Sequence, residues 1–312
     1  MPVTVYFAAG SAAWREYHDH LPQALTDAGV KAEILLAAPD PAVVDYIVFA
    51  PGGDIEDFAP FVNCKAVLNL WAGVERMVGN RTLTQPLARM VDPAMTESMV
   101  EWVVGHTLRH HLGMDLHILH QDGIWRNDIK PPIARERTVA VLGLGALGQE
   151  AGEALARLNF AVLGWSRSPK SIAGIECHSG EAGLDTVLSR AEIVILLMPL
   201  TAETENLMNA ARLARLPRGA VLINPGRGPL IDDTALLAAL DTGRVGHATL
   251  DVFRNEPLPK EHPFWAHPKV TVTPHIAAST RPLTASAVIA ENVRRGEAGE
   301  PFLYLVDRER GY

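Results

Sequence analysis

The sequence contains few cysteines, no excess of basic residues and no long apolar run. Two cysteines, Cys64 and Cys177, are too few for a disulfide framework and form no CxxC pair, which favours a reducing compartment. The strongest apolar run, Ile193 to Leu200, is far too short to cross a bilayer. Lys and Arg number 28 against 36 Asp and Glu, and the net charge of -8 argues against general binding to nucleic acids or anionic membranes.

The N-terminal residues show no secretory signal, since they have neither a basic segment nor a long apolar core. With 48% hydrophobic and 21% charged residues, the composition is that of an ordinary globular protein. At about 100–200 residues per domain, the 312 residues predict two domains. We therefore expect a cytoplasmic protein of two domains.

Short apolar runs alternate with helical stretches along most of the chain. The first series comprises Val3–Phe7, Lys31–Leu36, Asp45–Phe49 and Lys65–Leu70. The second, more uniformly apolar series comprises Thr138–Leu142, Ala161–Trp165, Glu192–Met198, Ala220–Ile223, Ala248–Val252 and Val270–Thr273. Uniformly apolar strands that alternate with helices are typical of parallel sheets covered on both faces, so the pattern predicts α/β, doubly wound parallel-sheet domains.

Two helical stretches bear on the organisation of the chain. The first runs from about Ala12 to Ala28 and ends at Gly29, a plausible helix cap. The second is unusually long, from about Ala94 to Gln121, and is followed by a break at Arg126 to Pro132. We expect this long helix to separate the two series of strands.

A glycine motif directly follows the run Thr138–Leu142. Its residues, all predicted to contact a cofactor, are Gly143, Leu144, Gly145, Ala146, Leu147 and Gly148. In a GxGxxG turn between a strand and a helix, the first glycine permits the tight turn, the second leaves room for a pyrophosphate, and the third lets helix and strand pack closely. The helix that follows would offer its free N–H groups to the phosphates. The motif predicts a dinucleotide-binding domain.

The end of the next predicted strand indicates which dinucleotide is bound. Sites for NAD usually carry an acidic residue there, which binds the ribose 2′-hydroxyl. This chain instead has hydroxyl and basic side chains at Ser166, Arg167, Ser168 and Lys170. Arginine binds phosphate in a bidentate manner, so the segment favours the 2′-phosphate of NADP over a merely solvated basic turn.

Three polar residues, Arg227, Glu256 and His275, each follow an apolar strand. In a doubly wound sheet the carboxyl ends of the strands line the ligand crevice, so the three side chains could meet there. Arginine can bind a keto acid, histidine can donate a proton near neutral pH, and a glutamate on its other ring nitrogen would orient it. Spacing alone also allows a surface arginine, a capping glutamate and a loop histidine.

Four segments together resemble the D-isomer-specific 2-hydroxyacid dehydrogenases: Gly143–Gly148, Asn224–Gly228, Asp251–Pro257 and Pro274–Ala277. Three more, Phe160–Lys170, Asp251–Pro259 and Val306–Tyr312, resemble members of that family that reduce small keto acids. The resemblance extends over essentially the whole chain. It implies that Arg227, Glu256 and His275 are the catalytic residues.

The resemblance also implies further binding residues. Those for the cofactor are Met198, Pro199, Thr204, Pro225, Gly226 and Asp251. Those for the substrate are Trp71, Ala72, Gly73, Val74 and Arg227, with the backbone of Ala72 to Val74 holding the substrate carboxylate. Trp71 stands where a small residue is expected, and its bulk predicts a restricted substrate side chain.

The family fold implies a Rossmann cofactor domain, residues 99–282, inserted in a flavodoxin-like substrate domain of residues 1–98 plus 283–312. Closure of the two domains would exclude water. The implied activity is NADPH-dependent reduction of small 2-keto acids, with glyoxylate and hydroxypyruvate as leading substrates and NADH as a possible second cofactor. The alternatives are an NAD-linked dehydrogenase of another 2-hydroxy acid and a nucleotide-sensing corepressor on the same fold, which would bind cofactor without turnover.

Five histidines crowd the long helical stretch: His106, His110, His111, His117 and His120. Structural metal sites need three or four ligands, and no carboxylate or cysteine nearby completes such a set, so we expect no metal. The apolar residues of the stretch cover more than one helix face: Met95, Met99, Trp102, Val103, Leu108, Leu112, Leu116 and Leu119. This excess predicts a homodimer with the helix at the contact, although the second face could also lie beneath the substrate domain.

Overall fold

The computed structural model describes residues 2–311, and the chain divides into two compact units. Unit 1 comprises Met1–Met95 and Ser279–Tyr312, and unit 2 comprises Thr96–Ala278. We propose that they correspond to the two predicted domains, whose limits we expected at 98/99 and 282/283. Met1 and Tyr312, at the outer limits of the predicted substrate domain, lie outside the described residues.

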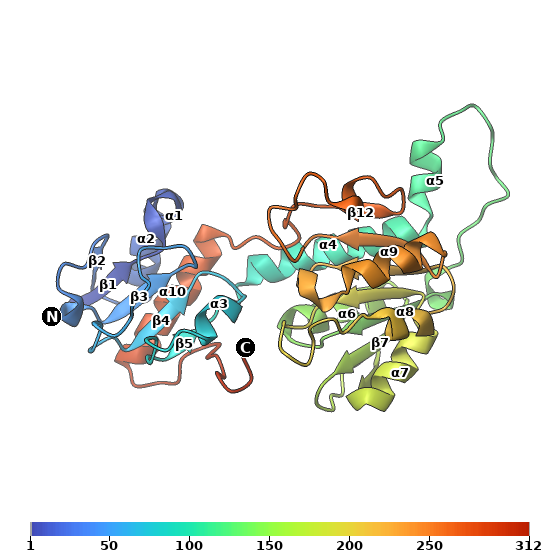
Figure 1. Cartoon of the computed structure of the whole chain (residues 1–312). Coiled ribbons are helices and arrows are strands. Elements are labelled where there is room, and N and C mark those ends of the chain that lie inside the picture. Colours follow the sequence, from blue (N-terminus) through green and yellow to red (C-terminus); the bar gives the residue numbers. More distant parts are fainter. Residues whose placement is uncertain (1, 312) are drawn as a thin grey trace. The chain divides into compact units, whose positions relative to one another are not determined.

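Unit 1 is built on a parallel sheet with the strand order β2-β1-β3-β4-β5 (Figure 1). Its strands are β1 (Val3–Phe7), β2 (Ala32–Leu35), β3 (Tyr46–Phe49), β4 (Ala66–Asn69) and β5 (Leu87–Ala88). Its helices are α1 (Gly10–Tyr17), α2 (His20–Asp27), α3 (Glu75–Val78) and α10 (Pro282–Glu297), with a 3-10 turn at Pro41–Val43. This order is the flavodoxin-like one, as predicted.

Each face of the unit 1 sheet has its own apolar core. Side chains of α2 and α10 pack on one face, and α10 follows the inserted unit 2 in sequence. The other face is covered by α3 and by aromatic residues of the loops, among them Phe58 and Phe61. All four residues of β3 are buried, as expected for a strand covered on both faces.

Unit 2 contains a longer parallel sheet with the order β12-β11-β10-β9-β6-β7-β8. Its strands are β6 (Thr138–Leu142), β7 (Ala161–Ser166), β8 (Ile175–Ser179), β9 (Ile193–Leu196), β10 (Ala220–Asn224), β11 (Val245–Leu250) and β12 (Val270–Val272). The direction of winding reverses between β6 and β9, as in the Rossmann fold that we predicted. Ligands of such sheets bind at the carboxyl ends of the strands beside this reversal.

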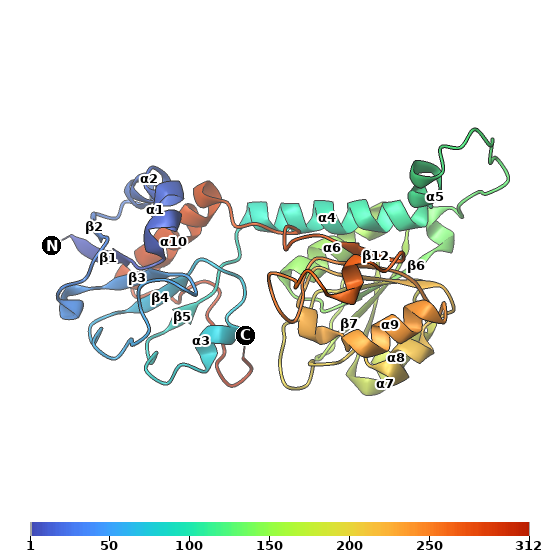
Figure 2. The same ribbon diagram turned by 45° about the horizontal axis from the view of Figure 1, so that its top comes forward.

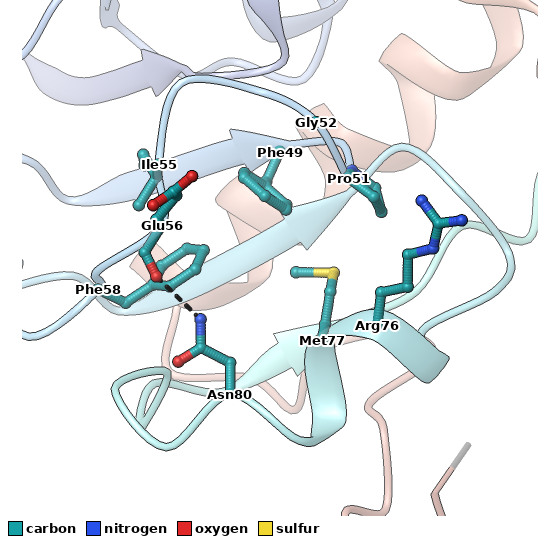
Figure 3. A pocket seen from close by; sticks show the side chains of 9 residues that line it. All are labelled: Phe49, Pro51, Gly52, Ile55, Glu56, Phe58, Arg76, Met77 and Asn80. Atoms are coloured by element: carbon teal, nitrogen blue, oxygen red, sulfur yellow. Dashed lines mark hydrogen bonds between the residues drawn. The ribbon is translucent and has the colours of Figure 1, made fainter.

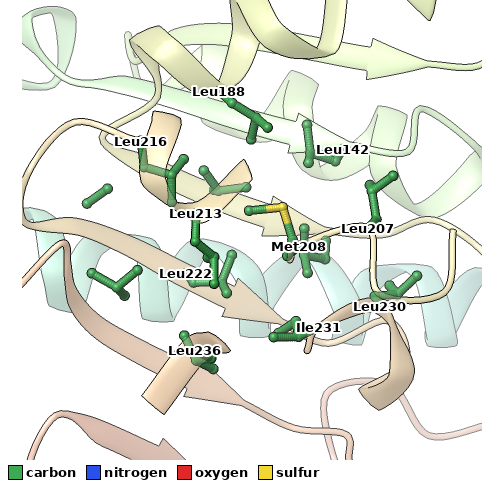
Figure 4. Close-up of a cluster of buried hydrophobic side chains, with 14 of the residues drawn as sticks. Leu142, Leu188, Leu207, Met208, Leu213, Leu216, Leu222, Leu230, Ile231 and Leu236 are labelled. Carbon is green, nitrogen blue, oxygen red and sulfur yellow. The ribbon is translucent and has the colours of Figure 1, made fainter. Parts of the chain in front are cut away.

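Helices cover both faces of the unit 2 sheet (Figure 2). They are α4 (Pro93–His111), which begins before the unit boundary, α6 (Ala146–Arg157), α7 (Gly180–Arg190), α8 (Ala210–Arg215) and α9 (Asp233–Asp241). The short helix α5 (Met114–Leu119) also belongs to this unit. Three 3-10 turns lie at Ala134–Glu136, Gly228–Leu230 and Pro263–Trp265. The core between α7, α8, α9 and the sheet consists largely of leucines, including Leu188, Leu213 and Leu236 (Figure 4). Side chains of α4 and α6 form the core on the opposite face.

The helical predictions need two corrections. The stretch from Ala12 to Ala28 is two helices, which break at His18 and Asp19, although Gly29 does end the second with a left-handed φ of 74°. The stretch from Ala94 to Gln121 ends as α4 at His111, because Gly113 adopts a left-handed φ of 61° before the short α5 begins. Figure 1 shows α5 and the segment after it extending away from the unit 2 sheet.

Two strands escape the sequence pattern. Strand β5 has only two residues, and β8 is an edge strand whose exposed and apolar positions alternate over a short length. Neither produces a continuous apolar run.

Within residues 2–311, no helix is long and apolar enough to cross a membrane.

Candidate active site

The glycine loop after β6 has the geometry of a dinucleotide site. Gly143 adopts a φ of 103°, and a Cβ there would lie 2.6 Å from the backbone of Leu197. A Cβ on Gly148 would overlap the carbonyl oxygen of Gly143. Both glycines are therefore required by the protein itself, the first for its backbone conformation and both for close packing.

Gly145 is different, because apart from its own neighbours along the chain nothing lies within 4 Å of the position of its missing Cβ. Packing within the protein gives no reason for glycine here. Helix α6 begins at the next residue, Ala146, and its first N–H groups have no partner inside the helix. Open space beside a helix N-terminus suits a pyrophosphate, so the residues present fit a dinucleotide.

The basic turn after β7 is tied to this loop. Lys170 donates a hydrogen bond of 2.5 Å from Nζ to the carbonyl oxygen of Leu144. Ser166 is buried and donates from Oγ to the carbonyl oxygen of Ser168 at 2.8 Å, while Arg167 is exposed. The turn that we expect to bind the 2′-phosphate thus lies against the glycine loop.

An acidic side chain that the sequence analysis missed lies near this turn. A hydrogen bond from Thr201, and to a smaller degree the charge of Arg167, lower the pKa of Glu203. Glu203 belongs to the loop after β9, far from Arg167 in sequence, so no local pattern points to it. Its carboxylate is therefore a negative charge close to Arg167, the arginine that we expect to bind the 2′-phosphate.

The loop after β9 contains the predicted cofactor residues Met198, Pro199 and Thr204. Thr204 closes the loop, because its Oγ1 donates to the carbonyl oxygen of Pro199 at 2.7 Å and accepts from the N–H of Thr201 at 2.7 Å. Met198 is buried in the core beneath it. Their contacts with the cofactor stay predictions.

The segment after β10 holds Arg227 in a tight turn. Asn224 donates to the carbonyl oxygen of Arg227 at 2.9 Å and accepts from the N–H of Gly226 at 3.1 Å. The guanidinium of Arg227 donates to the carbonyl oxygen of Gly226 at 2.7 Å, among other interactions. A Cβ on Gly226 would lie 2.7 Å from the carbonyl oxygen of Leu196, so this turn, which begins with Pro225 and Gly226, packs against the end of β9.

Glu256 and His275 form the closest polar pair of the predicted catalytic residues. Oε2 of Glu256 lies 2.7 Å from Nδ1 of His275, and its other oxygen accepts from the N–H of Phe253 at 2.8 Å. About half of the histidine side chain is exposed (53%). With Nδ1 engaged by the carboxylate, Nε2 is the nitrogen that can exchange a proton with a ligand.

Buried Asp251 holds the loop that carries this histidine. Its carboxylate accepts from the N–H groups of Ile276 (3.0 Å) and Ala277 (2.9 Å) and from the hydroxyl of Thr273 (2.5 Å). Its carbonyl oxygen accepts from the N–H of His275, whose φ of 56° is unusual for a residue with a side chain. Asp251 thus fixes the position of His275, a role that the sequence analysis did not assign. The cofactor contact expected for Asp251 stays a prediction.

The predicted substrate residues Trp71 to Val74 belong to unit 1. They follow β4, whose last residue, Asn69, donates from Nδ2 to the carbonyl oxygens of Trp71 (2.8 Å) and Gly73 (3.1 Å). Asn69 is almost completely buried, whereas Trp71 is 46% exposed. The side chain of Asn69 therefore holds the turn from Trp71 to Val74 in place. The sequence analysis also missed this role of Asn69.

A cavity of about 250 Å³ opens on the same face of unit 1 as α3 (Figure 3). Phe49, Phe58 and Met77 form its apolar part, and Arg76 and Asn80 contribute polar groups. Pro51 and Gly52, directly after β3, also line it. The cavity lies at the carboxyl end of the strand, where ligands of parallel sheets bind.

The histidines of α4 have structural partners within unit 2. His110 bonds to the hydroxyl of Thr249 at 2.8 Å and packs against the ring of His247. His106 packs on Trp102, and His111 packs on Phe160. Over residues 2–311, no group of three or more His, Cys, Asp or Glu side chains could hold a metal ion.

Comparisons with known proteins agree with this geometry. Residues 104–277 match the family model described as the NAD binding domain of D-isomer specific 2-hydroxyacid dehydrogenases. The chain is 38% identical over 264 residues to glyoxylate/hydroxypyruvate reductase A of Yersinia enterocolitica, an alignment that spans 82% of this chain and 84% of that protein.

Solved structures are similar over nearly the whole chain. A D-isomer specific 2-hydroxyacid dehydrogenase from Xanthobacter autotrophicus, in complex with NADPH and MES, is 42% identical with a TM-score of 0.91, covering 100% of both chains. An NADPH-dependent glyoxylate/hydroxypyruvate reductase from Sinorhizobium meliloti, in complex with NADP and sulfate, is 33% identical with a TM-score of 0.86, covering 99% of this chain and 100% of that one.

Proposed function

The chain belongs to the D-isomer-specific 2-hydroxyacid dehydrogenases, which are NAD(P)-dependent oxidoreductases, and we propose that it reduces small 2-keto acids with NADPH. Glyoxylate and hydroxypyruvate are the leading substrates, because they are the substrates named for the relatives from Yersinia enterocolitica and Sinorhizobium meliloti. The observation that carries the proposal is the pair of Glu256 and His275, whose 2.7 Å contact suits a proton donor next to a dinucleotide site.

His275 donates the proton to the carbonyl oxygen of the substrate. The carboxylate of Glu256 holds Nδ1 of the ring and so leaves Nε2 as the donating nitrogen. Asp251 keeps the backbone of His275 in its unusual conformation, so the ring needs no reorganisation during the reaction.

Arg227 binds the keto acid and polarises its carbonyl group. A guanidinium offers several N–H donors in one plane, which matches a carboxylate or a developing alkoxide. The turn from Asn224 to Gly226 determines where this side chain begins, because Asn224 bonds to both ends of the turn.

The glycine loop and the basic turn after β7 bind the cofactor. NADPH, when bound, supplies the hydride for C2 of the substrate. The N-terminus of α6 and the open space at Gly145 receive the pyrophosphate. Ser166, Arg167 and Lys170 bind the 2′-phosphate, a role supported by the NADPH and NADP named for the two bound structures.

In unit 1, the backbone of Ala72 to Val74 binds the substrate carboxylate. The N–H groups of Ala72 and Val74 donate no hydrogen bond to any described residue. They belong to the same peptide groups as the carbonyls of Trp71 and Gly73, which Asn69 holds. Since the C=O and N–H of a trans peptide point in opposite directions, both N–H groups point away from Asn69.

We also propose a homodimer and a cytoplasmic location. Met99 and Val103 of α4 are buried within the chain, so the dimer contact that we propose uses only later apolar residues, which include Leu112 and Leu119 of the predicted stretch. The exposed ones are Leu112, Met114, Ile118, Leu119, Ile124, Trp125, Ile129 and Ile133. Such a group of exposed apolar residues within one segment of the chain suits a closed symmetric dimer. The unpaired cysteines Cys64 and Cys177 suit a reducing compartment.

The proposed activity is tested by following NADPH oxidation spectrophotometrically with glyoxylate and hydroxypyruvate. We expect robust turnover by the unmodified protein and its loss in His275→Gln. Tight binding of NADPH with no turnover on a panel of keto acids would instead favour a nucleotide sensor. Turnover with NADH alone would favour an NAD-linked dehydrogenase.

A further inference from the structure

The carboxyl edge of the unit 1 sheet carries an arginine, Arg89, that no predicted role includes. Successive side chains of a strand point to opposite faces. Leu87 packs with Val67 on one face, while Ala88 and Met90 pack with the core of α10 on the other. Arg89 stands between Ala88 and Met90, so its side chain lies on the face of Leu87.

The guanidinium of Arg89 has no hydrogen bond and no ion pair with any residue from 2 to 311. It is only partly exposed, and burial lowers its pKa while the nearby Tyr304 opposes that shift slightly. An arginine side chain has five N–H donors and no acceptor, and burying its charge without an anion is costly. The position is therefore suited to an anion that comes from outside the chain.

Arg89 lies next to the turn from Trp71 to Val74, in which the N–H groups of Ala72 and Val74 donate no hydrogen bond to any described residue. Strands β4 and β5 pair with Leu68 opposite Ala88, so Asn69 and Arg89 follow side by side on the same face. Met90, the residue after Arg89, donates its N–H to the carbonyl oxygen of Trp71 at 3.0 Å. Asn69 is bonded to that same oxygen, and its own Oδ1 is buried without a partner.

These observations place two kinds of unused donor at one edge of the sheet. They are the guanidinium of Arg89 and the N–H groups of Ala72 and Val74. We propose that Arg89 binds the carboxylate of the keto acid together with these N–H groups. This inference rests on the proposed function and adds to it a second cationic residue for the substrate, in unit 1.

Two consequences follow from the chemistry. The planar guanidinium can bond both oxygens of a carboxylate, whereas a lysine ammonium provides a point charge. Arg89 should therefore matter for substrates that carry a carboxylate and not for their esters. Because Arg89 belongs to unit 1, its loss should leave cofactor binding in unit 2 unchanged.

The test compares Arg89→Met and Arg89→Lys with the unmodified protein, using glyoxylate and its methyl ester. We expect Arg89→Met to raise the KM for glyoxylate at least tenfold while kcat changes much less. Arg89→Lys should recover part of this loss, and the ester should be reduced by all three proteins with similar efficiency. Arg81→Met is the matched control, since Arg81 is an exposed arginine of the same unit.

A second measurement does not depend on turnover. Oxamate is an unreactive monocarboxylate, and its binding is measured by calorimetry; NADPH binding is measured by fluorescence. We expect Arg89→Met to weaken oxamate binding at least tenfold and to leave NADPH binding and the melting temperature unchanged. Equal losses for acid and ester, or weaker NADPH binding, would show a structural role and overturn the proposal.

The inference and the proposed function can fail separately. Suppose that the unmodified protein reduces no keto acid but binds oxamate, and that Arg89→Met does not bind it. The proposed function is then wrong and the anion site stands. If glyoxylate is reduced with the same KM by both proteins, the function stands and Arg89 binds no substrate.

Discussion

Oε2 of Glu256 lies 2.7 Å from Nδ1 of His275, although 19 residues separate them in the chain. Gln in place of Glu256 would keep a hydrogen bond to the ring but remove the negative charge beside it. We expect Glu256→Gln to lower kcat for glyoxylate on the order of a hundredfold and to leave NADPH binding unchanged. The exposed Glu261→Gln is the control, and equal rates for Glu256→Gln and the unmodified protein would contradict the role of the pair.

Asp251 holds the loop that carries His275, so its replacement should lower both stability and activity. In Asp251→Asn, the NH2 of the amide would replace one of the two oxygens and place a donor against the N–H of either Ile276 or Ala277, where the carboxylate now accepts. A buried group left without its partner costs about 1–3 kcal/mol, which thermal unfolding would detect. We expect kcat to fall as well, because His275 loses its support. Asp19→Asn, at an exposed position, should change neither quantity.

The basic turn after β7 predicts the cofactor preference. We expect the unmodified protein to prefer NADPH, and Arg167→Asp to lower its affinity for NADPH roughly ten- to a hundredfold, the loss of a charge-assisted bond of about 1.5–3 kcal/mol. Use of NADH should persist or improve, since an acid can bind the 2′-hydroxyl. Arg157→Asp, an exposed change on α6, is the control. Equal efficiency of the unmodified protein with both cofactors would refute the assignment.

The exposed apolar segment predicts the oligomeric state. Light scattering should give about twice the 33.8 kDa of one chain. Trp125→Asp combined with Ile118→Asp should favour the monomer, because both side chains are exposed in the single chain and their loss disturbs no core. A monomeric unmodified protein would refute the dimer, and a dimer that survives both changes would place the interface elsewhere.

Two partly buried histidines, His110 and His247, predict how stability depends on pH. Burial is the main cause that lowers the pKa of His110 to about 3 and of His247 to about 4, and the two rings lie 4.9 Å apart. The unfolded chain binds protons at these groups near pH 6.5, whereas the folded chain binds them only at much lower pH. Stability should therefore be highest above pH 6.5 and fall as the pH drops toward 4, by about 1.4 kcal/mol per pH unit for each histidine. His247→Gln should flatten this dependence in thermal unfolding, and the exposed His18→Gln should not.

Local sequence was sufficient for the features that depend on neighbouring residues. Apolar runs predicted most strands, since a strand covered on both faces must be apolar throughout. The spacing of Gly143, Gly145 and Gly148 predicted the turn at the end of β6, because a glycine at each of these positions is the local pattern of a strand–helix turn that binds a dinucleotide. Arg227, Glu256 and His275 were selected because each follows a strand, although spacing alone left other readings open for each.

The remaining features are decided by contacts between residues that are distant in sequence. The two-residue strand β5 depends on its pairing with β4, so no periodic pattern reveals it. The carboxylate of Asp251 and the N–H of Ala277 meet only because β11 and β12 are adjacent. Asn69 and Arg89 become neighbours only when β4 pairs with β5, which places a buried amide and an arginine without an anionic partner at one edge of the sheet. Sequence determined which chemical groups the protein has, and strand pairing determined which of them work together, because hydrogen bonds and charges act over a few ångströms in space and not along the chain.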